Sequence, residues 1–180
     1  MVSNNFNKLK HGFTLFEMVI VVGIISILTG ISFTYYGKYA EGKKLEAEAR
    51  KFSNTVSLAL KNASSANQES CNNFVGFNMS LDSINNRWFL QRCCNLVSSC
   101  SSIATYNLEN NVKVYSTVPQ SLVSIFFNRL GRGIVFNNNE VSQNAVVTLK
   151  NNSLDAKNCI NIDINKAGVI NIGERVNCVN

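Results

Sequence analysis

One acidic side chain, Glu17, stands alone in an almost entirely apolar stretch that runs from position 13 to position 36. An ionised carboxylate inside a membrane helix costs about 2.5–3.5 kcal/mol on insertion scales, so such residues are functional by default and usually have a partner. If the chain is cut after Gly12, Phe13 gains a free amine four residues before Glu17. That amine, on the same chain or on a neighbouring copy, is the natural counter-charge. Because the pair becomes favourable only when such helices pack, Glu17 is predicted to set the register of that packing.

The cysteines are the second set of side chains with chemistry of their own. Six occur, and an even number on one side of an apolar stretch indicates disulfide bonds formed in an oxidising compartment. Zinc binding is disfavoured, because the sole histidine, His11, precedes the apolar stretch and no Cys-x2-Cys pair occurs. Free buried thiols are the remaining alternative, so the sequence predicts disulfides and no metal site. All six cysteines follow the apolar stretch: Cys71, Cys93, Cys94, Cys100, Cys159 and Cys178.

No set of residues typical of catalysis is present. The sequence lacks a Gly-x-Ser-x-Gly turn, a His-Glu-x-x-His helix, a phosphate-binding Walker loop and a Gly-x-Gly-x-x-Gly turn. A chain cut after Gly12 also loses His11, which excludes acid–base chemistry and nucleophile activation by histidine. The sequence therefore predicts a protein that is not an enzyme and uses no cofactor.

The element that must position Glu17 is a membrane helix with a short basic leader before it. Residues 1–12 contain Lys8 and Lys10 and no acid, which leaves 6 − 2 = +4 of the net charge to the rest of the chain. The 24 residues from 13 to 36 form a helix of about 36 Å, longer than the hydrocarbon core of about 30 Å. The lysines keep the N-terminus cytoplasmic by the positive-inside rule, so the cysteine-bearing remainder faces outward.

Three simpler roles for the apolar stretch are disfavoured. A secretory signal would be followed by an Ala-x-Ala-like cleavage site, but Gly37, Lys38 and Tyr39 come next. A lipoprotein would carry a cysteine directly after the stretch, and none is there. A plain membrane anchor would not need an acid near its start.

The run Gly-Phe-Thr-Leu-Phe-Glu at positions 12–17 resembles the type IV prepilin signature closely. The resemblance implies that a prepilin peptidase cuts after Gly12 on the cytoplasmic side and methylates the new N-terminal Phe13. It also implies that Glu17 guides docking onto other pilin or pseudopilin subunits, and that membrane lipid surrounds the helix before assembly. Type II secretion pseudopilins share this signature. Major pilins commonly carry a helix-kinking proline in this segment, whereas Pro119 is the sole proline here.

The helical pattern continues beyond the apolar stretch as an amphipathic segment over residues 37–65. Charged residues lie between its regularly spaced apolar ones, which is typical of a helix with one buried stripe. We expect one continuous helix to about Asn62, ended in the region of Ser64 and Ser65, which packs its stripe on a β-sheet. The stripe consists of Leu45, Ala49, Phe52, Val56, Ala59 and Ala63.

The remaining residues, 66–180, are predicted to form a disulfide-containing, β-rich domain. Asn165 to Gly168 is predicted to be a hairpin turn, and Asn137 to Asn139 another loop. A long N-terminal helix packed on an antiparallel sheet makes the fold class α+β, which the resemblance identifies with the type IV pilin fold. The predicted strands are residues 74–78, 88–92, 112–118, 122–127, 133–136, 145–149, 160–165 and 169–172.

This domain resembles the GspH/FimT family of minor pilins and pseudopilins. The likeness lies in Phe-Asn-Arg-Leu-Gly-Arg-Gly at positions 127–133 and in the Cys-Ile-Asn-Ile-Asp run that precedes Gly168 and Cys178. The resemblance implies a disulfide between Cys159 and Cys178 that staples the final hairpin. A closed loop of about twenty residues contributes about 3 kcal/mol of stability in the chain-entropy model.

The other four cysteines keep two pairings open. Adjacent Cys93 and Cys94 are not expected to bond with each other, because that ring is strained. Either Cys71 bonds with Cys93 and Cys94 with Cys100, or Cys71 bonds with Cys94 and Cys93 with Cys100.

Some FimT-type minor pilins bind DNA through arginines near the C-terminus, so the resemblance makes DNA a candidate partner. DNA-binding members carry Gly-Arg-x-Arg where this chain has Gly-Glu-Arg-Val at positions 173–176. The chain therefore has one arginine in this stretch, Arg175, and an additional acid, Glu174. The candidate phosphate-binding residues are Arg129, Arg132, Lys150, Lys157, Lys166 and Arg175.

These expectations lead to one main hypothesis and two alternatives. The main hypothesis is a FimT-like minor type IV pilin that takes part in pilus assembly or priming. It would span the inner membrane once, with its C-terminal domain in the periplasm. The alternatives are a GspH-like pseudopilin of a type II secretion system and a DNA-binding minor pilin for natural transformation.

Overall fold

The computed structural model describes residues 13–65, 71, 73–120, 122–137 and 144–178, except for the side chains of Phe33 and Thr34. The predicted leader, with the cleavage residue Gly12, lies outside the described residues, as do Asn138 and Asn139 of a predicted loop. The chain divides into two compact units, Met1–Lys38 and Tyr39–Asn180.

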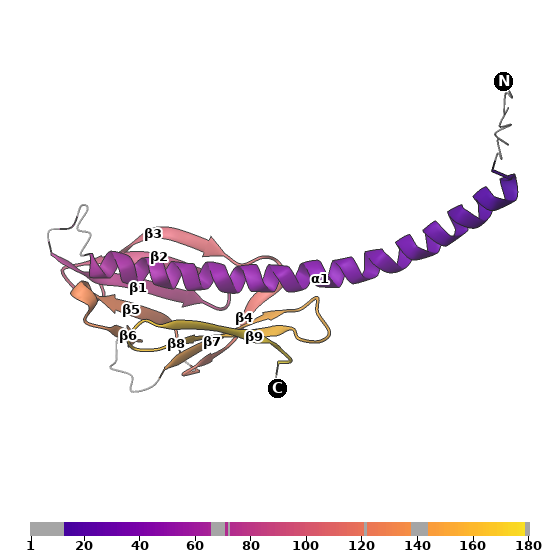
Figure 1. Cartoon of the computed structure of the whole chain (residues 1–180). Helices are drawn as coiled ribbons and strands as arrows, with labels where there is room; N and C mark the ends of the chain where they lie inside the picture. The colour runs from indigo at the N-terminus through magenta and orange to yellow at the C-terminus, as the bar shows by residue number, and fades with distance from the viewer. Residues whose placement is uncertain (1–12, 66–70, 72, 121, 138–143, 179–180) are drawn as a thin grey trace, which may run out of the picture. The chain divides into compact units, whose positions relative to one another are not determined.

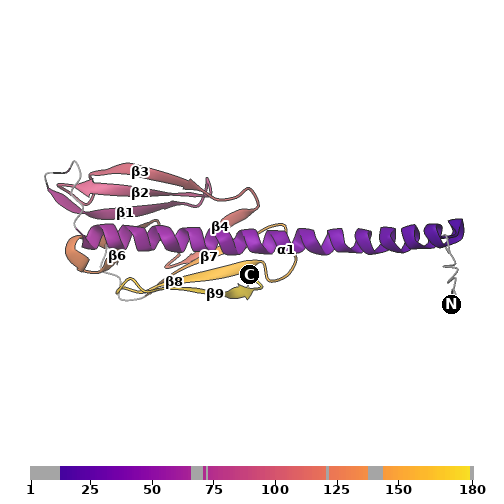
Figure 2. The same ribbon diagram turned by 45° about the horizontal axis from the view of Figure 1, so that its top comes forward.

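Helix α1 (Leu15–Ser64) is continuous over both halves of the predicted helical pattern. It ends at Ser64, in the predicted region, where the Ser65 backbone N–H donates to the Lys61 carbonyl (3.0 Å). Figures 1 and 2 show the second half of α1 lying along the strands. All six residues of the predicted stripe in this half are fully buried, as amphipathic spacing requires of a helix that covers a sheet.

The strands form two antiparallel sheets, and the α+β fold class is confirmed. The five-stranded sheet has the order β3-β2-β1-β5-β6, and the four-stranded sheet has the order β4-β7-β8-β9. A short 3-10 turn, η1 (Arg129–Gly131), joins β5 to β6. The strands are β1 (Phe74–Asp82), β2 (Arg87–Cys94), β3 (Cys100–Asn107), β4 (Val112–Val118), β5 (Ser124–Asn128), β6 (Ile134–Phe136), β7 (Ala145–Asn151), β8 (Cys159–Ile164) and β9 (Ile170–Val176).

Strand β3 is the element that the sequence prediction missed. It pairs only with β2, from Arg87 opposite Asn107 to Cys93 opposite Cys100, and so forms an edge of its sheet. Most of its residues are polar and exposed, because an edge strand over solvent does not have to bury every second side chain. The eight predicted strands are present, β4 with the predicted ends and the other seven with shifted ends, but the single sheet expected from the sequence is in fact two.

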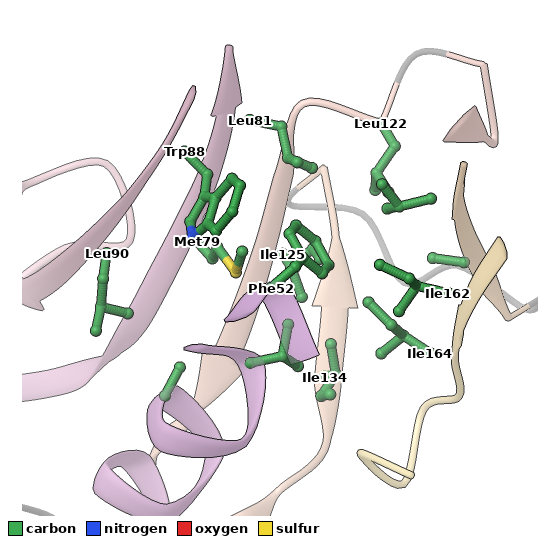
Figure 3. Packing of buried hydrophobic residues seen from close by; sticks show 14 of the residues in the cluster. Phe52, Met79, Leu81, Trp88, Leu90, Leu122, Ile125, Ile134, Ile162 and Ile164 are labelled. Carbon is green, nitrogen blue, oxygen red and sulfur yellow. The ribbon is translucent and has the colours of Figure 1, made fainter. Parts of the chain in front are cut away.

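The stripe of α1 completes one core with both sheets. Figure 3 shows Phe52 in the middle of this core, with Trp88 and Met79 on one side and Ile162 on the other. The rings of Phe52 and Trp88 meet edge to face, with centroids 5.3 Å apart. The Trp88 indole N–H donates to the Thr55 hydroxyl (3.4 Å), so the one polar atom of this ring has a partner.

All six cysteines form disulfides, which join Cys71 to Cys94, Cys93 to Cys100 and Cys159 to Cys178. Of the two pairings that the sequence left open, the structure contains the second. Neighbouring residues of a strand point to opposite faces, so adjacent Cys93 and Cys94 of β2 reach different partners. Cys93 lies directly opposite Cys100 in the β2–β3 ladder, whereas Cys94 reaches Cys71 just before β1.

Candidate assembly site

The first turn of α1 is closed by reciprocal hydrogen bonds between Thr14 and Glu17. The Thr14 backbone N–H and the Thr14 hydroxyl each donate to Glu17 Oε2, both at 2.9 Å. The Glu17 backbone N–H donates in return to Thr14 Oγ1 (3.2 Å). This is a capping box, in which two backbone donors that a helix start leaves without partners are satisfied. The Glu17 carboxylate is therefore held at the N-terminal end of the helix, where the helix dipole favours a negative charge.

Thr14 is the residue of this site that the sequence analysis missed. A Thr-x-x-Glu spacing directly before an apolar run is the sequence sign of a capping box, and it is present at positions 14–17. Phe13, the predicted new N-terminus, precedes the cap and is 76% exposed. Glu17 thus has a structural role in its own helix, in addition to the predicted role between helices.

The apolar part of α1 exposes its large side chains on every side of the helix. It is long and apolar enough to cross a membrane, and none of its most apolar window is buried by the rest of the described chain. Ser26, Thr29 and Ser32 each donate a hydroxyl hydrogen bond to the carbonyl four residues earlier, at 2.8, 2.7 and 2.8 Å. These hydroxyls therefore need no partner in a lipid environment.

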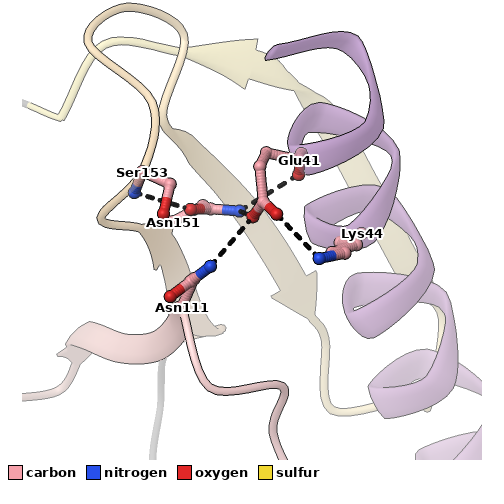
Figure 4. Close-up of polar contacts among 5 residues, drawn as sticks. All are labelled: Glu41, Lys44, Asn111, Asn151 and Ser153. Atoms are coloured by element: carbon pink, nitrogen blue, oxygen red, sulfur yellow. Dashed lines mark hydrogen bonds and ion pairs between the residues drawn. The ribbon is translucent and has the colours of Figure 1, made fainter. Parts of the chain in front are cut away.

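A polar clamp fixes α1 near Glu41 to the turn before β4 and to the end of β7. Figure 4 shows the Glu41 carboxylate between Lys44, Asn111 and Asn151. Asn151, which is fully buried, donates through Nδ2 to both the Glu41 carbonyl and Glu41 Oε2, each at 3.0 Å. Lys44 Nζ lies 2.7 Å from Glu41 Oε1, and Asn111 Nδ2 lies 3.3 Å from Oε2. The backbone N–H of Ser153 donates to Asn151 Oδ1 (2.8 Å), which orients the amide.

These contacts stabilise the ionised form of Glu41. The hydrogen bond from Asn151 is the largest cause, followed by that from Lys44, and together they lower the pKa of Glu41 to about 2. The clamp therefore holds at any pH well above that value. It fixes how the domain's strands are placed on the helix.

The six candidate DNA-binding residues do not form one surface. Arg129 and Arg132 line a pocket at η1, and the backbone carbonyl of Lys166 accepts a hydrogen bond from Ile134 nearby (3.2 Å). Lys150 lies with its Nζ 4.9 Å from the Tyr115 ring centre, on the face of β7 that points away from the core.

The last two cations lie on the helix side of the second sheet. Arg175 Nε is 3.4 Å from Glu46 Oε1 of α1, and Lys157 lines the same cavity. The acid Glu174 lines it as well. A nucleic acid backbone needs several phosphate contacts along one track, so DNA binding by these six residues stays a prediction.

Metal binding finds no support in the part of the chain that the structure describes. Within those residues, no group of three or more His, Cys, Asp or Glu side chains lies close enough together to hold a metal ion.

Residues 7–33 match the family described as the prokaryotic N-terminal methylation motif. No curated protein sequence matches the chain. Among solved structures, the chain is similar to the minor pseudopilin EpsH from the type 2 secretion system of Vibrio cholerae. The TM-score is 0.54 over 73% of this chain and 97% of that chain, at 8% sequence identity. At this identity the likeness concerns the fold alone.

The chain thus carries a type IV pilin-like methylation motif at its N-terminus and shares its fold with a minor pseudopilin. A pilin-like chain is a structural protein and not an enzyme, as the sequence predicts. The motif implies processing by a prepilin peptidase and assembly with other pilins. Together with the apolar helix it indicates anchoring in the inner membrane before assembly.

Proposed function

We propose that this pilin-like chain is a minor type IV pilin that takes part in the assembly or priming of a pilus. Before assembly, residues 13–36 hold it in the inner membrane, with the disulfide-bonded domain in the periplasm. A prepilin peptidase cuts after Gly12 and methylates Phe13. The observation that carries the proposal is the methylation motif at residues 7–33. Glu17 is the sole charge of residues 13–36, whose large apolar side chains are exposed all round the helix.

The geometry of the first turn supports a direct role for Glu17 in subunit docking. Its carboxylate lies 2.9 Å from the backbone nitrogen of Thr14, the residue that follows Phe13. Cleavage would create an amine on Phe13 next to this position, and a second amine would come with each neighbouring subunit. A carboxylate in lipid without a cation is unfavourable by about 2.5–3.5 kcal/mol. Pairing with a neighbour's amine would therefore favour the packed helices over the separate ones.

Mass spectrometry of the mature chain tests the processing step. We expect a protein that begins at Phe13, carries one methyl group on its terminal nitrogen and is six hydrogen atoms lighter than the reduced chain, because three disulfides have formed by oxidation. A functional protein that still begins with Met1 would contradict the proposal.

Two substitutions at one position separate the charge of Glu17 from its capping role. Glu17→Gln keeps a side chain that can complete the capping box but removes the charge, whereas Glu17→Ala removes both. We expect both variants to be processed nearly normally and to enter filaments at least tenfold less than the wild type. Thr14→Ala is the matched control, because it weakens the cap by about 1 kcal/mol and keeps the charge. Normal incorporation of Glu17→Gln would show that the charge is not needed.

A pseudopilin of a type II secretion system is the second candidate function. The observation in its favour is the fold shared with the minor pseudopilin EpsH, almost the whole of which is covered. Deletion of the chain distinguishes the two. Loss of surface pili with normal protein secretion supports the minor pilin, and loss of secretion with normal pili supports the pseudopilin.

A further inference from the structure

We propose that the pocket at η1 binds a carboxylate from a second copy of this chain, so that two copies make a head-to-tail contact. The proposal rests on the proposed function, because it concerns how a filament is started. The pocket has a volume of about 460 Å³ and lies where β5 turns into β6, beside the start of β1. It is lined by Phe74, Val75, Asn128, Arg129, Leu130 and Arg132.

Among the residues that the structure describes, no acid lines this pocket. Arg129 Nε is buried and has no hydrogen-bond partner among the described residues. The lining contains a second arginine, Arg132. A buried donor without a partner is unfavourable, and more so when it is charged. An anion between the two guanidinium groups would remove this cost.

The turn itself is held in an unusual backbone conformation. Leu130 has φ 61° and ψ 31°, a left-handed conformation that is unfavourable for a residue with a Cβ. Its side chain is 59% exposed, so no burial in this chain offsets that cost. Residues held in such conformations cluster at binding sites. Leu130 thereby presents an apolar surface at the pocket mouth.

The mixed lining favours a carboxylate on an aliphatic stem over a nucleic acid. Arginine forms two parallel hydrogen bonds with a carboxylate, while Phe74, Val75 and Leu130 offer apolar contact to the carbons that carry it. A nucleic acid would need further phosphate contacts. Lys150, Lys157 and Arg175 do not line this pocket, and Arg175 is paired with Glu46. The site therefore suits a single acidic side chain.

The opposite end of the same domain presents such a side chain. Gly131 lies next to Ser64, the last residue of α1. Glu109 is exposed in the connection between β3 and β4, and Asn111 of the same connection donates to Glu41 of α1 (3.3 Å). Glu41 precedes Ser64 by 23 residues, which is about 35 Å along a helix.

A cationic pocket at one end of the domain and an exposed carboxylate at the other can join copies in series. Contacts of this head-to-tail kind extend into open helical filaments unless the rotation closes a ring. We therefore assign Glu109 of a second copy as the occupant. A contact between copies would let this chain start a filament before other subunits join it.

Charge reversal and rescue test the contact in the full-length chain in detergent. A photo-reactive phenylalanine placed at Leu130 should cross-link to the peptide that contains Glu109 of a second copy. Arg129→Glu with Arg132→Glu should lower the yield at least tenfold, and Glu109→Arg should lower it similarly. The three changes together should restore it, because the charges are again opposite. Lys150→Glu with Lys157→Glu is the matched control and should leave the yield unchanged.

Two results would overturn the proposal. One is that neither Arg129→Glu with Arg132→Glu nor Glu109→Arg changes the cross-link yield. The other is that the variant with all three changes cross-links as poorly as the variants with one reversed side. If Arg129→Glu with Arg132→Glu prevents folding, Arg129→Gln with Arg132→Gln replaces it in the cross-linking test. Its melting temperature is measured first, to check that the variant is folded. A failure here is separable from a failure of the proposed function, because processing at Gly12 and the effect of Glu17→Gln do not depend on this pocket.

Discussion

The two halves of helix α1 differ in where their packing partners are. The half before Lys38 exposes its apolar side chains on every side, whereas the half after Tyr39 buries a single stripe against two sheets. The partners of the second half are within the chain, and those of the first half have to come from lipid or from other helices. One continuous helix thus serves folding in one half and assembly in the other.

The two acids nearest the start of each half show the same difference. Glu17 makes its hydrogen bonds to Thr14, within one helical turn. Glu41 pairs with Lys44 in its own helix and also binds Asn111 and Asn151, which lie 70 and 110 residues away. A carboxylate that is satisfied by remote residues stabilises a tertiary structure. One that is satisfied only locally remains available to a neighbouring subunit.

The largest expected difference concerns two phenylalanines of α1. Phe52→Ala should lower the free energy of unfolding of the domain by about 3–5 kcal/mol, because Phe52 is fully buried against Trp88. Phe16→Ala should change it by less than about 0.5 kcal/mol, because Phe16 is 72% exposed. Denaturant titration in detergent, followed by the fluorescence of the sole tryptophan, measures both. Equal losses would mean that the first half also packs within the chain.

The disulfides should have the next largest effect, confined to the second unit. Replacing Cys159 and Cys178 by serine should cost about 3 kcal/mol, and replacing Cys93 and Cys100 about 2 kcal/mol. The bonds span 19 and 7 residues, and the longer loop loses more entropy on closure. The same titration ranks the two variants, while fractionation checks that membrane anchoring is unchanged. A larger loss from the shorter loop would contradict the loop-entropy explanation.

The smallest effect is the pH dependence that Glu41 gives to the domain. Its pKa is lowered to about 2, so the stability it contributes is present above about pH 4.5 and is lost as the pH falls toward 2. Glu41→Gln should lose less stability over that range than the wild type does. The dependence should not vanish, since the pKa of Asp82 is also lowered to about 2 by Asn85 and Arg87. Melting temperatures between pH 7 and pH 2 measure this dependence, and Glu109→Gln, which changes an exposed acid, is the control. If the melting temperature falls equally steeply with pH in the wild type and in Glu41→Gln, the clamp is excluded as the cause of the pH dependence.

Features that depend on neighbouring residues could be predicted from the sequence. The apolar stretch, its lone Glu17 and the helical stripe from Leu45 to Ala63 all follow from spacing along one helix, and membrane thickness sets the length of the stretch. The Thr14 cap was equally readable from the Thr-x-x-Glu spacing and was missed because Glu17 was considered only as a partner for the Phe13 amine. The sites of cleavage and methylation remain predictions that rest on the motif.

The sequence by itself thus determined the helix, its two kinds of surface and the place of its one membrane acid, because helical periodicity is local. Only the tertiary structure decided that the strands divide into two sheets, that Cys94 bonds with Cys71, and that Asn151 reaches Glu41 across 110 residues. It also separated the six cations and left Arg129 and Arg132 together at one pocket. Strand pairing and surface clustering join residues far apart in the chain, and their partners are chosen by packing in three dimensions.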